Sequence, residues 1–353
     1  MWVHLCGEGG APCRAPAPGT RPFTVDVHCH VVTPAVEALV AGHPAKLAEV
    51  AAMQQSMGPA SAAHNQAVML PQALPRLMDM AQRLADMDAM GVDVQVLSPS
   101  PHQYHYWAEP ALAEEIVALQ NAHIAALCAA HPERLRGLGT VSLQHPSCAA
   151  AQLAHAVQGL GLQGVEISTS AAGRELDDPA LDPFWAMAAA LQAVVFLHPF
   201  GTQLGARLAT HYLSNTIGQP LETTVALSRL IFGGVLDRHP GLRILAAHGG
   251  GYLPTCLGRS THARAVRPEA ATMARAPRDY LREMFFDTVV HEPMALRHLI
   301  EVVGASQVLM GTDYPFDMGH DAPHALMAAI PGVTDAEQAA LLGGNARRLF
   351  GIG

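Results

Sequence analysis

The sequence contains very little lysine. Of its 21 basic residues 20 are arginine, and Lys46 is the single lysine. A mechanism that needs an active-site lysine is therefore excluded unless Lys46 supplies it. Only 14% of the 353 residues are charged, and the formal net charge is −9. This composition lacks the basic excess that is typical of nucleic-acid-binding proteins, so we expect no nucleic-acid partner.

Paired cysteines and long apolar segments are also missing. The six cysteines, at positions 6, 13, 29, 128, 148 and 256, form no CxxC pair, and we interpret them as reduced thiols of a cytoplasmic protein. Residues 1–22 are rich in Gly, Pro and Ala, lack the pattern of a signal peptide and are expected to be a disordered leader. The longest uncharged stretch, residues 183–206, is interrupted by polar residues, proline and glycine, so no membrane span is predicted.

Half of the residues are apolar, and short apolar segments alternate with longer stretches of helical period. Strands are predicted at 24–30, 92–98, 135–141, 164–168, 194–198, 242–248, 285–288 and 308–313, and helices at 77–90, 110–131, 147–160, 179–192, 222–237, 294–303 and 335–350. Eight alternating strands predict an α/β fold, a distorted (β/α)8 TIM barrel over residues 23–353. A doubly wound open sheet is the alternative, but the Gly-rich phosphate fingerprint that it needs is missing.

One segment interrupts this alternation. Residues 31–76, between the first strand and its helix, form a long insertion that contains Met53, Met57 and Met69. In a barrel, a long connection after a strand usually lies over the active site, so we interpret it as a lid. A surface insertion without a role is the alternative.

Histidine is abundant, with 20 residues, and several end a predicted strand. His28 and His30 lie two apart on one strand, so their side chains point the same way. His198, His248 and Asp313 end three further strands. Barrel enzymes place their sites at this face, and polar groups there are costly unless they are paired or bind a metal.

Histidine nitrogens together with one carboxylate are ligands for a divalent ion of intermediate softness. Zn²⁺ is the first expectation, and Mn²⁺, Fe²⁺ and Co²⁺ are the alternatives. Three histidines and one aspartate with a position left open for water describe a catalytic site better than a structural one.

The motifs as a set resemble the amidohydrolase-2 branch of the metal-dependent amidohydrolases, and within it the aminocarboxymuconate-semialdehyde decarboxylases. The matching segments are His28–His30, His198-Pro199, His248–Gly251, Gly311–Pro315, 87–96, 257–259, 314–316 and 344–346. The resemblance extends from Thr24 to Ile352. It implies a TIM-barrel enzyme, but this branch contains decarboxylases, hydratases and hydrolases.

The resemblance also implies roles for individual residues. The implied metal ligands are His28, His30, His198 and Asp313. His248 would stay unligated and act as general base towards a metal-bound water, beside Asp313. Arg259 would bind a substrate carboxylate and, about three helical turns past His248, would reach it from the second subunit of a homodimer. The alternative for Arg259 is an ion pair on the helix surface.

The sequence departs from the family decarboxylase in its lid. Pro71 stands where that enzyme carries an arginine for a substrate carboxylate, and Arg76 is the nearest basic residue. Phe200 replaces the tryptophan that follows the HP pair, and the lid offers His64 and Asn65 instead. These differences leave the exact substrate open and the metal site intact.

Further residues are candidates for the substrate pocket or for a second metal. The expected pocket residues, besides Arg259, are Phe200, Phe316, His64, His102 and Trp107. For His102 and Trp107 an exposed aromatic loop is the alternative. Glu166 stands on the strand where binuclear barrels carry a carboxylated lysine, and could hold a second metal or, as we expect, point outward or bond to a metal ligand.

Three functions follow from these residues. The leading one is metal-dependent, non-oxidative decarboxylation of an unsaturated or aromatic carboxylic acid. The second is metal-dependent hydrolysis of an amide, lactone or related ring bond, and the third is a non-catalytic metal-binding barrel. Because a decarboxylase needs a cation for the carboxylate, Arg259 favours the first, with a small-molecule carboxylate as substrate.

Overall fold

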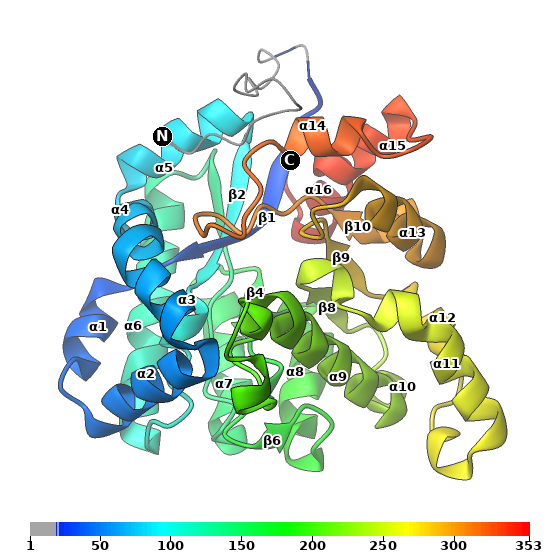
Figure 1. Cartoon of the computed structure of the whole chain (residues 1–353), viewed down its shortest axis with the longest axis horizontal. Helices are drawn as coiled ribbons and strands as arrows, with labels where there is room; N and C mark the ends of the chain where they lie inside the picture. Colours follow the sequence, from blue (N-terminus) through cyan, green and yellow to red (C-terminus); the bar gives the residue numbers. More distant parts are fainter. Residues whose placement is uncertain (1–18, 20) are drawn as a thin grey trace.

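The computed structural model describes residue 19 and residues 21–353 of the chain (Figure 1). Eight parallel strands form its centre: β1 (Val25–Val31), β2 (Val94–Pro99), β3 (Leu135–Gly137), β4 (Gly164–Ile167), β7 (Val194–Leu197), β8 (Arg243–Ala246), β9 (Phe285–Asp287) and β10 (Val308–Leu309). They pair in two arcs, β1-β2-β3 and β10-β9-β8-β7-β4. Single bridges between Cys29 and Tyr314 and between Gly139 and Val165 join the arcs into a ring. The predicted (β/α)8 barrel is confirmed.

Helices surround this ring (Figure 1). They are α1 (Pro34–Val40), α2 (Pro44–Met57), α3 (Pro59–His64), α4 (Leu70–Met78), α5 (Met80–Met90), α6 (Pro110–Ala130), α7 (Pro146–Ala154), α8 (Asp182–Leu191), α9 (Gln219–Phe232), α10 (Val235–Arg238), α11 (Leu253–Val266), α12 (Pro277–Leu281), α13 (Pro293–Val303), α14 (Pro323–Ala328), α15 (Asp335–Ala339) and α16 (Asn345–Phe350). A short antiparallel hairpin, β5 (Ser170–Ala171) and β6 (Arg174–Glu175), lies outside the barrel. None of these helices combines the length and apolar character needed to cross a membrane.

The core consists of two layers. Apolar side chains of the strands fill the barrel, and α16 contributes Leu349 and Phe350 to this inner cluster. A larger cluster fills the space between the strands and the surrounding helices. In this cluster α16 packs with Val25, Val94 and Val194, the first residues of β1, β2 and β7, so it covers the amino ends of the strands. The carboxyl ends of the strands are therefore the open end, where barrel enzymes bind their substrates.

The strands match the predicted segments, but six of the eight end earlier, whereas β1 and β2 each end one residue later. His198, His248 and Asp313, expected as the last residues of strands, lie one, two and four residues beyond β7, β8 and β10. The predicted helix 77–90 is divided, because the Asp79 carboxylate accepts hydrogen bonds from the amides of Ala81 and Gln82 and starts α5 there.

The predicted insertion at 31–76 is mainly helical rather than a loop, since α1 to α4 occupy most of it, in blue down one side of Figure 1. It packs on the connection after β7, where a Cβ added to Gly58 would lie 1.7 Å from the carbonyl oxygen of Ala209. A function of this segment as a lid over bound substrate stays a prediction.

The predicted leader, residues 1–22, lies mostly outside the described residues, which leave out 1–18 and 20. Arg21 belongs to the folded structure, because its guanidinium lies 2.6 Å from the Asp93 carboxylate. Among the described cysteines, Cys29, Cys128, Cys148 and Cys256 are free, as expected for reduced thiols. Cys6 and Cys13 lie outside the described residues.

Gly164 at the start of β4 offers a test of barrel packing. Its φ is 154°, and an added Cβ would lie 1.9 Å from the carbonyl oxygen of Val194 on β7. We expect Gly164→Ala to lower the thermal unfolding midpoint by about 5 °C or more, because the two strands must move apart. Gly42→Ala is the control, since no atom lies within 4 Å of that Cβ, and equal midpoints for the two variants would contradict the packing.

Candidate metal centre

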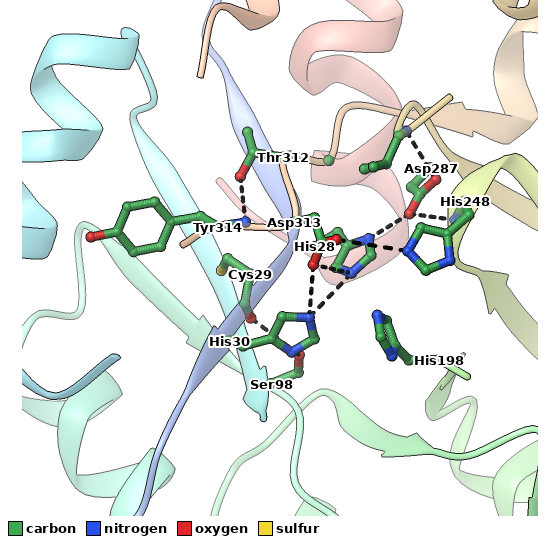
Figure 2. A network of polar contacts seen from close by, with 12 residues as sticks. His28, Cys29, His30, Ser98, His198, His248, Asp287, Thr312, Asp313 and Tyr314 are labelled. Carbon is green, nitrogen blue, oxygen red and sulfur yellow. Dashed lines mark hydrogen bonds and ion pairs between the residues drawn. The ribbon is translucent and has the colours of Figure 1, made fainter. Parts of the chain in front are cut away.

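Four side chains from three strand ends converge at the open end of the barrel. His28 and His30 come from β1, His198 follows β7, and Asp313 follows β10. All four residues are buried, and their ligand atoms lie within 4.8 Å of one another. Figure 2 shows the three rings and the carboxylate facing a common point. The predicted ligand set is brought together, and residues 19 and 21–353 contain no second group of this kind.

The spacing of the donor atoms fits one metal ion. His28 Nε2 and His30 Nε2 lie 3.2 Å apart, and each lies 3.3 Å from Asp313 Oδ1. Donors bound tetrahedrally at ~2.1 Å from an ion are about 3.4 Å apart. Asp313 Oδ1 and both ring nitrogens of His198 have no hydrogen-bond partner. Since buried polar atoms without partners are costly, a cation is the group that these residues fit.

The charges of the side chains agree with this assignment. Burial alone would lower the pKa of His28, but the charges of Asp313 and Asp287 outweigh it and raise the pKa to about 10. Burial would raise the pKa of Asp313, but the charge of His28 and the close ring nitrogens of His248, His28 and His30 hold it well below its usual range. Burial and the adjacent histidines lower the pKa of His198. Without a metal, a proton on His28 therefore takes the place of the cation.

Asp287 at the end of β9 orients His28. Its Oδ2 lies 2.5 Å from His28 Nδ1 and accepts the backbone N–H of His248 at 3.0 Å, while Oδ1 accepts that of Gly249 at 2.8 Å. This contact fixes the proton on Nδ1 and turns Nε2 towards the metal position. Asp287 lies in a predicted strand and is an aspartate near a strand end, like Asp313, but no role was expected for it from the sequence.

Glu166 lies beside another ligand rather than facing outward. Its Oε1 accepts the Tyr104 hydroxyl at 2.6 Å, and its Oε2 lies 3.6 Å from His30 Nδ1. The Nδ1 of His30 also lies 3.1 Å from the carbonyl oxygen of Pro99. Burial raises the pKa of Glu166, which is not in the four-residue metal group.

His248 stands next to the four ligands without belonging to their group. Its Nε2 lies 3.7 Å from Asp313 Oδ2, and its ring centre is 5.1 Å from that of His198. The backbone of His248 has a φ of 55°, and the three glycines that follow also have positive φ values. Gly250 is required in this run, since an added Cβ would lie 2.7 Å from the Phe286 ring. The geometry allows proton transfer in the site, and the role of general base stays a prediction.

Of the predicted pocket residues, Phe316 lies beside a metal ligand, whereas Phe200 lies beside Tyr104, whose hydroxyl bonds to Glu166. The Phe316 ring is 5.5 Å from that of His30, and the Phe200 ring is 6.2 Å from that of Tyr104. His64 reaches from α3 towards the segment after β10, where its Nε2 lies 3.7 Å from the Asp317 carboxylate.

His102 and Trp107 contact the insertion instead. His102 Nε2 lies 3.4 Å from the Glu37 carboxylate of α1. The Trp107 ring stacks on His43 at 4.5 Å and packs against a cluster of α1 and α6. They join the insertion to the segment after β2, and the structure shows no contact of either ring with a metal ligand.

Arg259 lies on α11, exposed to solvent. In the described part of the chain no carboxylate forms a salt bridge with it. The surface ion pair considered for Arg259 is therefore not formed within the subunit.

A parallel barrel with one buried His₃Asp centre and a free histidine at its open end defines a class of mononuclear metal-dependent enzymes. Residues 25–352 match the family model described as amidohydrolase, and the chain belongs to this family. It is 35% identical over 272 residues to the 2-amino-3-carboxymuconate-6-semialdehyde decarboxylase of Dictyostelium discoideum, with 76% of each chain covered. The resemblance predicted from the motifs is confirmed.

Two further relatives are decarboxylases of aromatic acids. The chain is 30% identical over 293 residues to the gamma-resorcylate decarboxylase of Rhodococcus jostii, which covers 78% of this chain and 88% of the relative. A solved dihydroxybenzoic acid decarboxylase from a Polaromonas species, with bound manganese and the inhibitor 2-nitroresorcinol, superimposes with a TM-score of 0.78. It is 25% identical, over 94% of this chain and 97% of the other.

The proton on His28 predicts that metal binding depends on pH. Below about pH 10, the metal must displace this proton from the metal-free site. The apparent affinity should therefore rise about tenfold per pH unit between pH 7 and 9 and level off near pH 10. Calorimetric titration of the metal-stripped protein, in buffers of different ionisation enthalpy, should show close to one metal and about one released proton per chain.

The control for this titration is His28→Ala, which should lose tight binding. An affinity that is constant from pH 7 to 9, with no proton release, would contradict the charge state assigned to His28.

Proposed function

We propose that the chain catalyses metal-dependent, non-oxidative decarboxylation of an aromatic or unsaturated carboxylic acid. The observation that carries this proposal is the buried four-ligand centre with a free histidine beside it, in a chain whose relatives above are decarboxylases. Metal-dependent hydrolysis of an amide, lactone or related ring bond would use the same groups and is the second candidate. A non-catalytic metal-binding barrel would not need a free histidine at 3.7 Å from a ligand carboxylate.

The metal is the first finer point of the proposal. Three histidines and one aspartate favour Zn²⁺, and the Polaromonas relative with its bound manganese makes Mn²⁺ the alternative. When bound, either ion lowers the pKa of water at the site and offsets the negative charge of the substrate.

Proton transfer is assigned to His248. Its Nε2 takes a proton from water in the site and delivers it to the substrate carbon that carries the carboxylate. The new C–H bond forms, the bond to the carboxylate breaks, its electron pair returns to the carbon skeleton and CO₂ leaves. Asp313 stays ionised throughout, because its pKa lies well below the usual range.

The substrate is held by aromatic and cationic side chains. Phe316 provides an apolar face next to His30, and Phe200 provides one next to Tyr104. Arg76 does not replace the missing lid arginine, because its guanidinium bonds to the Asp86 carboxylate at 2.9 Å and to the carbonyl oxygen of Gln72 at 2.8 Å. Lys46 is held by the carbonyl oxygen of His102 at 3.1 Å.

Arg259 is the cation that we assign to the substrate carboxylate. It is eleven residues past His248 and about 9 Å along α11 from the first residue of that helix. An exposed, unpaired arginine at this position suits the site of a neighbouring chain better than its own. We therefore propose a homodimer in which each subunit supplies Arg259 to its partner. The free thiols support a location in the reducing cytoplasm.

The reaction is tested with a panel of substrates. It contains 2-amino-3-carboxymuconate semialdehyde, 2,6-dihydroxybenzoate, 5-carboxyvanillate and a set of lactones and amides, given to protein reloaded with Zn²⁺ or Mn²⁺. We expect CO₂ release from at least one carboxylate, and a loss of at least about 100-fold in metal-stripped protein and in His248→Ala. Ring opening or amide cleavage without CO₂ would instead support the hydrolase.

Subunit exchange tests the position of Arg259. Arg259→Ala and His248→Ala should each be nearly inactive alone. After mixing and exchange they should recover about a quarter of the wild-type activity, because random pairing gives half heterodimers and one of their two sites is intact. Mixing labelled subunits verifies the exchange, and no recovery despite exchange would place Arg259 in its own subunit's site or in none.

A further inference from the structure

Along strand β1, the alternation of inward-facing and outward-facing side chains is interrupted. Val25 and Val27 pack in the inner cluster, whereas Cys29 packs in the outer layer between strands and helices. In a regular strand all three would share one face. From Asp26 to Cys29 the strand advances by three residues while β2 advances by two, from Gln95 to Leu97. This extra residue is a β-bulge.

The bulge directs the metal ligands of β1. It allows His28 and His30 to face the interior although Val25 and Val27 do so as well. The ring of His28 consequently lies 4.9 Å from that of His198. Whatever stabilises the bulge therefore sets the position of two of the four ligands.

Asp26 occupies the bulge and bonds to both of its sides. Its Oδ1 accepts the backbone N–H groups of His28 at 3.1 Å and of Thr312 at 3.0 Å. Its Oδ2 accepts the Thr312 hydroxyl at 2.7 Å and the Gln95 amide at 3.0 Å. Asp26 is 0% exposed. It thus joins β1 to β2 and to the segment that leads from β10 to Asp313.

Gln95 connects Asp26 to a buried arginine. Its Oε1 accepts Arg83 Nη1 at 2.8 Å, so its amide nitrogen must face Asp26. Arg83, from α5, is also 0% exposed and donates to the carbonyl oxygen of His30. Its guanidinium carbon lies 4.7 Å from the centre of the Tyr314 ring.

These contacts hold the main chain of three metal ligands. Asp26 binds the N–H of His28, Arg83 binds the carbonyl oxygen of His30, and the N–H of Asp313 bonds to the carbonyl oxygen of His28 at 2.8 Å. We propose that Asp26, Gln95 and Arg83 form a positioning relay that sets the geometry and affinity of the metal centre without touching the metal. The proposal rests on the metal site within the proposed function and is independent of which substrate is used.

The direction of the hydrogen bonds makes the relay testable. Every partner of Asp26 is a donor, and Gln95 accepts from Arg83 and donates to Asp26. In Asp26→Asn, an amide nitrogen on the Gln95 side would face the amide nitrogen of Gln95. Turning the Gln95 amide over only moves the clash of donors to Arg83. Adding Gln95→Glu supplies an acceptor to both neighbours and restores the pattern with the same total charge.

The experiment measures binding of Zn²⁺ and Co²⁺ to the metal-stripped full chain by competition with a chelator. We expect Asp26→Asn to weaken both affinities about 10- to 100-fold and to alter the visible absorption of bound Co²⁺. The double variant Asp26→Asn/Gln95→Glu should bind both ions at least about tenfold more tightly than Asp26→Asn. Unchanged affinity and Co²⁺ spectrum in Asp26→Asn, or a double variant no better than the single one, would overturn the relay.

Two threonine variants complete the test. Thr312→Val removes the hydroxyl that donates to Asp26 and accepts the backbone N–H of Tyr314, and should reproduce the loss, whereas Thr312→Ser keeps both bonds and should retain the wild-type affinity. This pair decides the matter if Asp26→Asn does not fold. Thr223→Val is the control for removing a buried hydroxyl, because that hydroxyl bonds only within α9, to the carbonyl oxygen of Gln219. Since metal binding is the readout, a wild-type protein that binds metal but releases no CO₂ would refute the proposed function and not the relay.

Discussion

The structure depends on the convergence of three imidazoles and one carboxylate at a single buried point. His28, His30, His198 and Asp313 come from strands that are distant in sequence, and only closure of the barrel brings them together. Without a cation this point carries a cost: both ring nitrogens of His198 are buried without a hydrogen-bond partner, and the adjacent carboxylates raise the pKa of His28 to about 10. The barrel core and the contacts of Asp287 and Asp26 hold these groups in place against that cost.

Much of this arrangement could be predicted from the sequence. Strand ends are visible as apolar runs that stop at a polar residue, so the barrel and its five candidate side chains could be named. The family resemblance then divided these into four ligands and the unligated His248. Asp287 could not be given a role, because a sequence does not show which ring nitrogen a carboxylate will meet. The bulge at Asp26 was also invisible, since VDVHCH alternates regularly and only pairing with β2 shows the extra residue. The insertion was expected as a loop because α2, its longest helix, has little apolar periodicity and its other helices are short.

The backbone around the centre is as specialised as its side chains. His248 and Asp313 both have φ values in the left-handed region, at 55° and 58°. Side chains pay a steric penalty there, and such residues persist only where surrounding contacts determine them. The Asp287 carboxylate accepts the backbone N–H groups of His248 and Gly249, and the carbonyl oxygen of His28 accepts the backbone N–H of Asp313. Asp287 thus orients His28 and also fixes the strained backbone at His248, while His28 fixes the strained backbone at Asp313. The groups of the centre are therefore connected by hydrogen bonds.

The residues that form the metal centre are different from those that we assign to substrate selection. The metal ligands lie on strands or just beyond them and are buried. Of the residues that differ from the family decarboxylase, Pro71, His64 and Asn65 lie on the insertion and Phe200 follows β7. Pro71 removes a cation from the insertion, Arg76 is occupied by Asp86, and Arg259 is exposed without a partner in its own subunit. A carboxylate bound at the metal can therefore be selected by surfaces that change without disturbing the ligands. Under the proposed function, the same centre serves acids of different shape, and the insertion and Arg259 select among them.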